Sequence, residues 1–472
     1  MEASGSAGPA ARPGLWSDLR EALRGSHRDF TTESIPRSIF LLAVPMMLEL
    51  VLESVFAVVD VFAVNRIGPD AVATVGLTES MLVLVYGVAM GVGIGAMALV
   101  ARRVGEKDPE RAARTAVQAI VLALLLAVPV VVLGITFAPT LLGLMGASGW
   151  VLEHGVRYTQ IMMGSTVSIT LLFLINAIFR GAGDAAVAMR VLWLASGINI
   201  VLAPSLVLGL GPFPRLGVVG AALGTTIGRT CGVLYQFWQL SRPGGRITIQ
   251  RRHLHVEWAT IRQVLNLSGS ATVQVLVGMA SWIGIVRIIS GFGSAAVAGY
   301  TIGIRIVLFA LLPSVGLANA AATLVGQNLG ARQPDRAARS AWLAGGFNAA
   351  FLGVIGLLLL ATAPGLIHIF DPEPVVAGFA VSCLRVISLG FAFYGLGMVM
   401  SQALNGAGDT RTPTLINLGC FWVLELPLAW GLSHGLGLGP LGAFVAILVA
   451  FCTVAVAGTL AFRAGRWKQR FI

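Results

Sequence analysis

Apolar stretches long enough to cross a membrane recur along the whole chain. A helix needs about 20 apolar residues to span the ~30 Å hydrocarbon layer of a bilayer. Such stretches fall at roughly 36–65, 72–101, 115–145, 153–180, 187–212 and 216–241, and then at roughly 260–290, 295–326, 338–368, 375–404, 411–434 and 439–463. The pattern predicts an all-α polytopic membrane protein with twelve transmembrane helices.

The two groups of six helices are related by an internal duplication. Residues 180–184, Arg-Gly-Ala-Gly-Asp, recur 225 positions later as residues 405–409, Asn-Gly-Ala-Gly-Asp, and Gly105 and Gly330 keep the same offset. Because each group contains an even number of helices, both halves enter the membrane from the same side. Such parallel repeats are typical of transporters, which place their site at the repeat interface.

This organisation divides the chain into five parts. They are an N-terminal tail (1–35), a six-helix lobe (36–241), an inter-lobe linker (242–259), a second six-helix lobe (260–463) and a basic C-terminal tail (464–472). The first 35 residues have no apolar core, which argues against a cleaved signal peptide, and we expect a short surface helix near residues 16–23.

The basic residues predict the orientation of the chain in the membrane. Of the 32 Lys and Arg residues, 25 lie in the tails and the even-numbered loops, whereas the odd-numbered loops contain only Arg66 and Arg215. Positive charge collects on the cytoplasmic side, so we expect both termini, the tails and the linker to be cytoplasmic, in a plasma (bacterial inner) membrane. Since the charge is spread along one membrane face, we expect no nucleic-acid partner.

Composition and motifs exclude most enzyme classes. Hydrophobic residues make up 56% of the chain and charged residues 11%, whereas soluble domains contain about 25% charged residues. The four cysteines lie in apolar segments without a CxxC pair, so neither a metal site nor a cofactor is expected. No Walker motif occurs, and the glycines of residues 91–95 lie inside an apolar span, where close helix packing explains them better than nucleotide binding. We expect a secondary transporter, not an enzyme.

Three acidic residues occupy one face of the first helix. Glu49, Glu53 and Asp60 are spaced by four and seven residues, which places them along one helical face. An acid inside the membrane costs at least ~2.5 kcal/mol on insertion scales and needs a reason to be there. The stripe therefore predicts a cation or proton site, with structural pairing to an intramembrane arginine as the alternative.

Other polar residues within the spans are candidates for the wall of the same cavity. Glu79 and Glu425 either extend that cavity or pair with arginines, while Asn176, Asn199 and Gln274 either coordinate a cation or a drug or join neighbouring helices. Asp184 and Asp409 follow the repeated glycines at tight turns, where we interpret them as caps or gates.

Several features together resemble the multidrug and toxic compound extrusion (MATE) transporters. They are the first helix from Pro45 to Asp60, the paired turns at 180–184 and 405–409, Asn199 followed by Pro204, and the six-plus-six topology. The resemblance covers roughly residues 36–463. It implies a V-shaped, two-lobed bundle that exports organic cations or drugs in exchange for protons or sodium, and we expect it to act as a monomer in the lipid bilayer.

The resemblance also implies individual site residues. The family's first-helix acid falls on Asp60, its fifth-helix asparagine on Asn199, and its sixth-helix threonine on Thr225 or Thr226. Where many members have an aspartate four residues after that asparagine, this chain has Ala203. The seventh helix contains no acid between residues 268 and 293, although some members place one there.

These missing acids favour protons over sodium as the coupling ion. A sodium site needs several hard oxygen ligands, whereas proton exchange needs one titratable group. We therefore expect an antiporter in which Asp60 exchanges protons and Glu53 and Glu49 act as relay or cation-attracting groups. A sodium-coupled drug antiporter and a flippase of lipid-linked oligosaccharides are the alternatives. Relatives that move such lipids generally have cationic cavities, whereas the first helix here is acidic.

Overall fold

The structure is a computed structural model that describes residues 14–26, 28–370, 372–470 and 472, with the side chains of residues 56–63 left out. All regular elements of the described residues are helices. The N-terminal half contains α1 (Leu15–Arg24), α2 (Ile35–Asn65), α3 (Pro69–Gly105), α4 (Pro109–Thr136), α5 (Ala138–Leu144), η1 (Val151–Gly155), α6 (Val156–Gly164), α7 (Thr166–Ala182), α8 (Ala185–Leu208) and α9 (Val218–Ser241). The linker contains the short turn η2 (Arg251–His253).

The C-terminal half repeats this organisation with more breaks. It contains α10 (Trp258–Ser290), α11 (Ser294–Gly330), α12 (Pro334–His368), α13 (Pro374–Ser388), α14 (Phe391–Gly406), α15 (Arg411–Asn417), η3 (Leu418–Glu425), α16 (Leu426–Trp430), η4 (Gly431–Gly435), α17 (Pro440–Arg463) and η5 (Arg466–Gln469).

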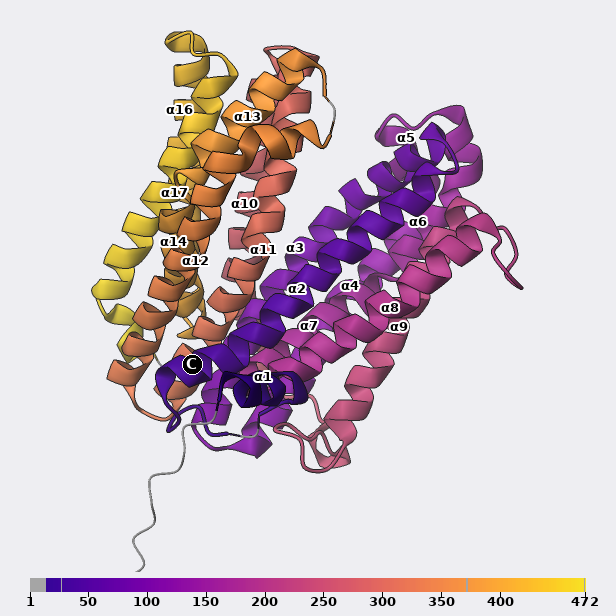
Figure 1. The fold of residues 1–472 in the computed structure, drawn as a ribbon. Coiled ribbons are helices and arrows are strands. Elements are labelled where there is room, and N and C mark those ends of the chain that lie inside the picture. The colour runs from indigo at the N-terminus through magenta and orange to yellow at the C-terminus, as the bar shows by residue number, and fades with distance from the viewer. Residues whose placement is uncertain (1–13, 27, 371, 471) are drawn as a thin grey trace, which may run out of the picture.

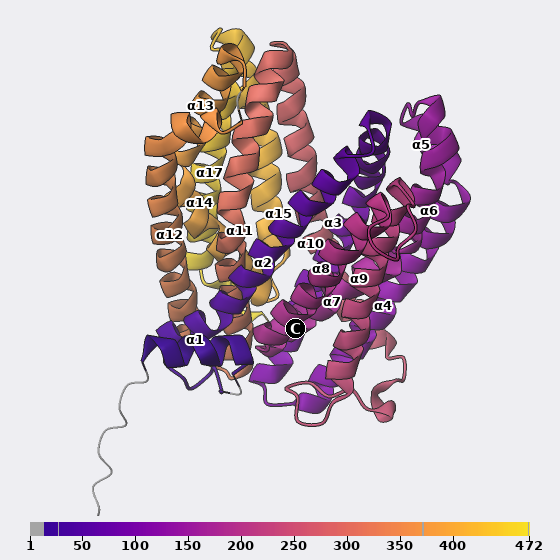
Figure 2. The ribbon, with the colours of Figure 1, turned by 45° about the vertical axis from the view of Figure 1, so that its right-hand side comes forward.

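The predicted twelve-span, all-α fold is confirmed. By length and composition, ten helical runs of the described residues can cross a membrane, and α13 with α14, bent by 56°, forms an eleventh. The twelfth predicted span, at roughly 216–241, corresponds to the 24-residue helix α9, which packs along α8. The short helix expected near residues 16–23 is α1, which lies across the ends of the spans (Figures 1 and 2).

The two six-helix lobes form a V. Figures 1 and 2 show the lobes touching at the end that carries α1 and the C-terminus, and diverging toward the end that carries α5. Several helix pairs connect the lobes, above all α3 with α10 and α11, and α2 with α11. We call the end where the lobes touch the closed end.

Small residues let the lobes approach each other closely. A Cβ atom on Gly91 would lie 2.1 Å from Oγ1 of Thr272, and one on Gly95 would lie 2.4 Å from Oγ of Ser268. Because both partners belong to α10, these glycines serve the packing between the lobes, as their position in an apolar span predicts.

The duplicated turns have the same geometry in both halves. Gly183 and Gly408 each have φ of 84°, a left-handed conformation that glycine adopts without steric cost. In each turn the next residue, Asp184 or Asp409, donates its backbone N–H to a carbonyl five residues earlier, at 2.8 and 2.9 Å. A left-handed glycine followed by this hydrogen bond is a common way for a helix to end, as the repeated Gly-Ala-Gly-Asp motif predicts.

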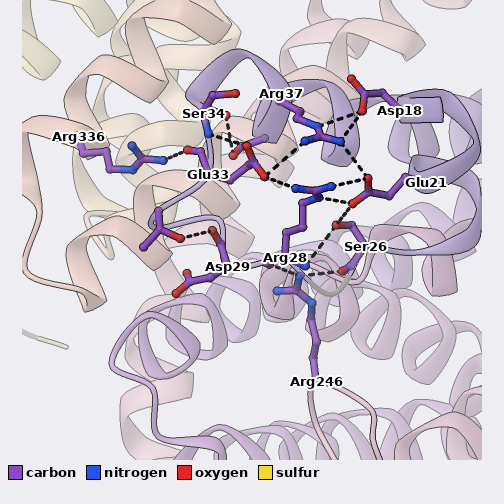
Figure 3. A network of polar contacts seen from close by, with 12 residues as sticks. Asp18, Glu21, Ser26, Arg28, Asp29, Glu33, Ser34, Arg37, Arg246 and Arg336 are labelled. Carbon is purple, nitrogen blue, oxygen red and sulfur yellow. Dashed lines mark hydrogen bonds and ion pairs between the residues drawn. The ribbon is translucent and has the colours of Figure 1, made fainter. Parts of the chain in front are cut away.

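The segment that joins α1 to α2 contacts both lobes at the closed end (Figure 3). Arg246, which follows α9, donates hydrogen bonds to the carbonyls of Ser26 and Arg28 at 2.8 and 2.6 Å. Arg336 of α12 donates to the carbonyl of Glu33. Since Arg246 belongs to the linker side of the first lobe and Arg336 to the second, this segment bridges the two lobes. We call its described residues, 25–26 and 28–34, the N-terminal strap.

Ion pairs hold α1 and the N-terminal strap together. Arg28 pairs with Glu21 at 2.6 Å and with Glu33 at 2.7 Å. Arg37, in the first turn of α2, pairs with Asp18 at 2.6 Å. These side chains form the network drawn in Figure 3.

The C-terminal residues make a reciprocal connection. The carbonyl of Arg470 accepts a hydrogen bond from Arg102 of α3 at 2.7 Å, and the Arg470 guanidinium donates to Asp409 at 3.1 Å. Ile472 packs against the apolar core of the first lobe. The segments near both termini thus form contacts with both lobes at the closed end.

The N-terminal strap is expected to loosen in acid. The hydrogen bond from Arg28 holds the pKa of Glu21 below its ordinary value of 4.5. Burial raises the pKa of Glu33, but hydrogen bonds from Ser34 and Arg28 outweigh it and leave this pKa lowered as well. Groups with lowered pKa values stabilise the folded state above their unfolded pKa, and this contribution is lost as the pH falls through the folded value.

We therefore expect hydrogen exchange in residues 14–34, corrected for its intrinsic pH dependence, to rise several-fold below about pH 4.5. A Glu21→Gln/Glu33→Gln variant should show the raised exchange already at pH 7. Equal protection of wild type and variant at pH 7 would contradict the role given to these ion pairs.

Candidate functional site

A central cavity of about 500 Å³ lies between the lobes. Most of its wall is apolar or aromatic. Among the residues predicted from the sequence, those that line it are Glu49, Glu53, Asn176, Gln274 and Glu425. They come from α2, α7, α10 and η3 and so from both lobes, as expected for a site at the repeat interface.

Glu49 forms a buried ion pair. Its Oε1 accepts hydrogen bonds from Nη1 of Arg180 at 2.8 Å and from Nδ2 of Asn176 at 3.1 Å. The Glu49 side chain is 4% exposed and that of Arg180 is 15% exposed. Asn176 in turn accepts from Gln236 at 2.8 Å. The arrangement corresponds to the alternative in which an arginine pairs with an acid of the first helix.

Sequence reasoning did not identify Arg180 as this partner. Arg180 stands in the repeated turn motif, where the sequence predicts a basic residue of a cytoplasmic loop. It lies within the last turn of α7 and extends into the cavity. The repeat-related residue is Asn405, so the loss of symmetry at this position is the sequence signal that could have distinguished Arg180.

A second, smaller cavity of about 20 Å³ lies inside the first lobe, which is room for about one water molecule. It is lined in part by Glu53, Asn199, Thr225 and Arg229. Nδ2 of Asn199 donates to Oγ1 of Thr225 at 2.8 Å, while Oδ1 of Asn199 is buried with no hydrogen-bond partner among the side chains that the structure describes. Of the two threonines predicted as candidates, Thr225 is therefore the one that contacts Asn199.

Arg229 brings a positive charge to this polar region. It donates a hydrogen bond to Oη of Tyr86 at 3.0 Å and interacts electrostatically with Glu53 and Glu79. Glu79 does not line the central cavity, and its position beside Arg229 fits the alternative of structural pairing. Nη1 of Arg229 is buried without a hydrogen-bond partner among the described residues.

The remaining candidates lie elsewhere. Asp184 and Asp409 belong to the turns at the closed end, and Asp409 accepts hydrogen bonds from Thr412 and Arg470. The Oγ1 of Thr226 is buried, and no described residue forms a hydrogen bond with it. The backbone of Asp60 continues α2, but its side chain lies outside the described residues, so its assignment stays a prediction. The described residues contain no cluster of three or more His, Cys, Asp or Glu side chains that could hold a metal ion.

The model of the MatE family matches residues 45–205 and again residues 270–430. The chain belongs to the MatE family. The second match begins 225 residues after the first, which is the offset of the repeated motifs. As a MatE protein the chain is a membrane transporter and not an enzyme, as predicted.

Curated relatives match over nearly the full length. The probable multidrug resistance protein YoeA of Bacillus subtilis is 28% identical over 422 residues, 89% of this chain and 91% of that protein. The probable multidrug resistance protein NorM of Thermotoga maritima is 24% identical over 442 residues, 93% of this chain and 94% of that protein. A FAD transporter of Shewanella oneidensis is 26% identical over 377 residues, 79% of this chain and 83% of that protein.

Solved structures share the fold. An outward-facing structure of a multidrug resistance transporter of the MATE family superposes with a TM-score of 0.86 at 25% identity, covering 92% of this chain and 96% of that chain. A crystal structure of a MATE protein in the straight conformation gives a TM-score of 0.86 at 24% identity, covering 92% of this chain and 97% of that chain. The two-lobed architecture of this MatE protein is thus the one that its sequence predicts.

Proposed function

We propose that this MatE protein is a secondary active antiporter that exports hydrophobic organic cations in exchange for protons. The observation that carries the proposal is the charge of the central cavity. Its charged lining residues, among those described, are Glu49, Glu53, Glu425 and Arg180, and Arg180 is bonded to Glu49. Of the other two acids, Glu53 shares the small cavity with Arg229, which does not line the central cavity. The wall of the central cavity is therefore mainly apolar with an excess of negative charge, which favours ligands that are both hydrophobic and positively charged.

This charge balance bears on the alternative substrates. FAD carries phosphate groups, and lipid-linked oligosaccharides are anionic as well, so each would meet an acidic wall whose one arginine is already paired. The names of the relatives YoeA and NorM, both described as probable multidrug resistance proteins, support drug export instead.

The direction of transport follows from the predicted orientation. If positive charge marks the cytoplasmic side, the closed end with both termini faces the cytoplasm and the V opens outward. The structure then corresponds to the state that releases substrate outside the cell. The contacts of the N-terminal strap and of the C-terminal residues must break when the lobes separate at the closed end to admit substrate from the cytoplasm.

Arg229 supports protons over sodium as the coupling ion. The small cavity of the first lobe offers oxygens of Asn199, Thr225 and Glu53, but Arg229 lines the same cavity. The guanidinium opposes binding of a metal cation in the same cavity, and it also lowers the proton affinity of a carboxylate beside it. A proton needs only one titratable group, however, whereas a sodium ion needs several oxygen ligands within this small cavity. Asp60 on the same helix as Glu53 is the proposed proton acceptor, with Glu53 as the relay.

Purified protein in proteoliposomes tests the coupling ion. An acidic lumen should drive accumulation of ethidium, because protons leave as the cation enters. A sodium-loaded lumen at equal internal and external pH should drive none. Accumulation driven by sodium alone would contradict the proposal and favour the sodium-coupled alternative, while movement of lipid-linked oligosaccharide without ethidium transport would favour the flippase.

A further inference from the structure

We propose that Glu425 and the aromatic side chains around it form a subsite for an organic ammonium ion in the second lobe. The proposal rests on the proposed export of organic cations, because it says where in the cavity the positive charge of the substrate binds.

Glu425 is buried and unpaired. It is 5% exposed and lines the central cavity. Among the residues that the structure describes, its carboxylate has neither a hydrogen-bond nor an ion-pair partner. Removing a carboxylate from water without a counter-charge is costly. The site is therefore built to be completed by a proton or by a cation that comes from outside the protein.

The backbone at Glu425 is irregular. Glu425 ends the π-helix η3, and Pro427 follows two residues later. Proline has no N–H to donate to the carbonyl of Val423, so the ordinary helical hydrogen bond is missing there. Such wide turns inside helices occur frequently at functional sites. Glu425 stands at the end of this wide turn and lines the cavity.

Aromatic residues of the second lobe line the cavity together with Glu425. They are Trp282 of α10, Tyr300 of α11, Tyr394 of α14, Phe421 of η3 and Phe451 of α17. The Tyr394 and Phe451 rings stack with centroids 3.9 Å apart and planes 18° apart. The charge of Glu425 acts on the hydroxyls of both Tyr300 and Tyr394.

Aromatic faces and one carboxylate together define the chemistry of the ligand. A ring face attracts a cation through its quadrupole, most strongly when water is excluded, and aromatic cages bind quaternary ammonium groups in this way. A metal ion would need several oxygen ligands, and this wall offers one carboxylate. An organic ammonium ion satisfies both the charge and the apolar surroundings.

Three acids of the first lobe, unlike Glu425, interact with arginines. Glu49 is bonded to Arg180 at 2.8 Å, and Glu53 and Glu79 both interact with Arg229. Among the described residues, Glu425 has no such arginine. The uncompensated negative charge of the described cavity wall therefore lies in the second lobe, whereas the proposed proton-exchanging helix belongs to the first. This separates the place where the cation binds from the place where the proton is exchanged.

The test is equilibrium binding of ethidium to the full-length protein in detergent, without any gradient. Glu425→Gln keeps the size of the side chain and removes its charge, so we expect the Kd to rise at least tenfold. Glu373→Gln, the same substitution on an exposed residue of the same lobe, should leave the Kd unchanged. Trp282→Leu should also weaken binding, because it removes an aromatic face.

Binding and transport fail in distinguishable ways. A Glu425→Gln variant that binds ethidium as tightly as wild type overturns the subsite, even if proton-driven export is intact. A wild-type protein that binds ethidium through Glu425 but shows no proton-driven transport supports the subsite and contradicts the proposed function. A melting temperature of Glu425→Gln equal to that of wild type establishes that weaker binding is not a consequence of misfolding.

Discussion

Replacing Gly105 with leucine is expected to reduce transport at least tenfold and to force the lobes apart at the closed end. Gly105 is the last residue of α3 and is buried against α11. A Cβ atom there would lie 2.0 Å from the carbonyl oxygen of Gln327. Because the neighbour is backbone, no side-chain rotation can relieve the clash, and overpacking of this kind costs about 1–3 kcal/mol.

The repeat-related residue makes the same contact from the other side. A Cβ atom on Gly330 would lie 2.2 Å from the carbonyl oxygen of Arg102 and 2.9 Å from Cα of Gly105. The two glycines, 225 residues apart, thus meet where the lobes touch. Gly330→Leu should therefore resemble Gly105→Leu in its effect.

The measurement combines ethidium efflux from cells with a distance between spin labels placed on the two lobes at the closed end. Gly346→Leu is the matched control, since Gly346 lies within α12 with no atom near its missing Cβ. A longer distance and lost efflux in Gly105→Leu, with both unchanged in the control, is the expected result. Normal efflux by Gly105→Leu would contradict the role assigned to this contact.

Replacing Arg180 with methionine is expected to lower the free energy of unfolding by about 3–5 kcal/mol, because it leaves a buried carboxylate without its partner. Glu49 would keep only the hydrogen bond from Asn176 at 3.1 Å. Adding Glu49→Gln should recover much of the loss, since the pair is then removed as a whole.

Thermal unfolding of the purified variants measures this coupling. Arg157→Met, which removes an exposed arginine of α6, should change the melting temperature little. If Arg180→Met and the double variant melt at the same temperature, Glu49 does not depend on Arg180 and the ion pair is not structural.

The sequence predicts the fold well because each span carries its own signal. Apolar length predicts twelve helices, and the offset of 225 predicts the two lobes. The breaks within helices could not be predicted in the same way. The span expected at 375–404 is divided into α13 and α14 at a bend of 56°, and Glu425 lies at the end of a π-helix. Gly390 and Pro427 stand at or next to these breaks, but neither residue alone says whether a span bends or widens there, because packing between helices decides it.

The site could be predicted only in part. Helical spacing identifies acids on one face of α2, but it cannot say which residue of another helix meets them. Glu49 and Arg180 are 131 residues apart in the chain, and Arg229 reaches Glu53 and Glu79 from α9. Such pairings are set by tertiary packing. They change the interpretation of Glu49 from a free acid to one member of an ion pair.

Proton movement during transport is the most direct test of proton-coupled export. Proteoliposomes with a pH-sensitive dye in the lumen are prepared without sodium and at equal internal and external pH, and ethidium is then added outside. Wild-type protein should make the lumen alkaline, because protons leave as the cation enters, whereas Asp60→Asn and empty liposomes should not. A lumen that stays at constant pH while wild-type protein takes up ethidium, or that changes only when sodium is present, would contradict the account.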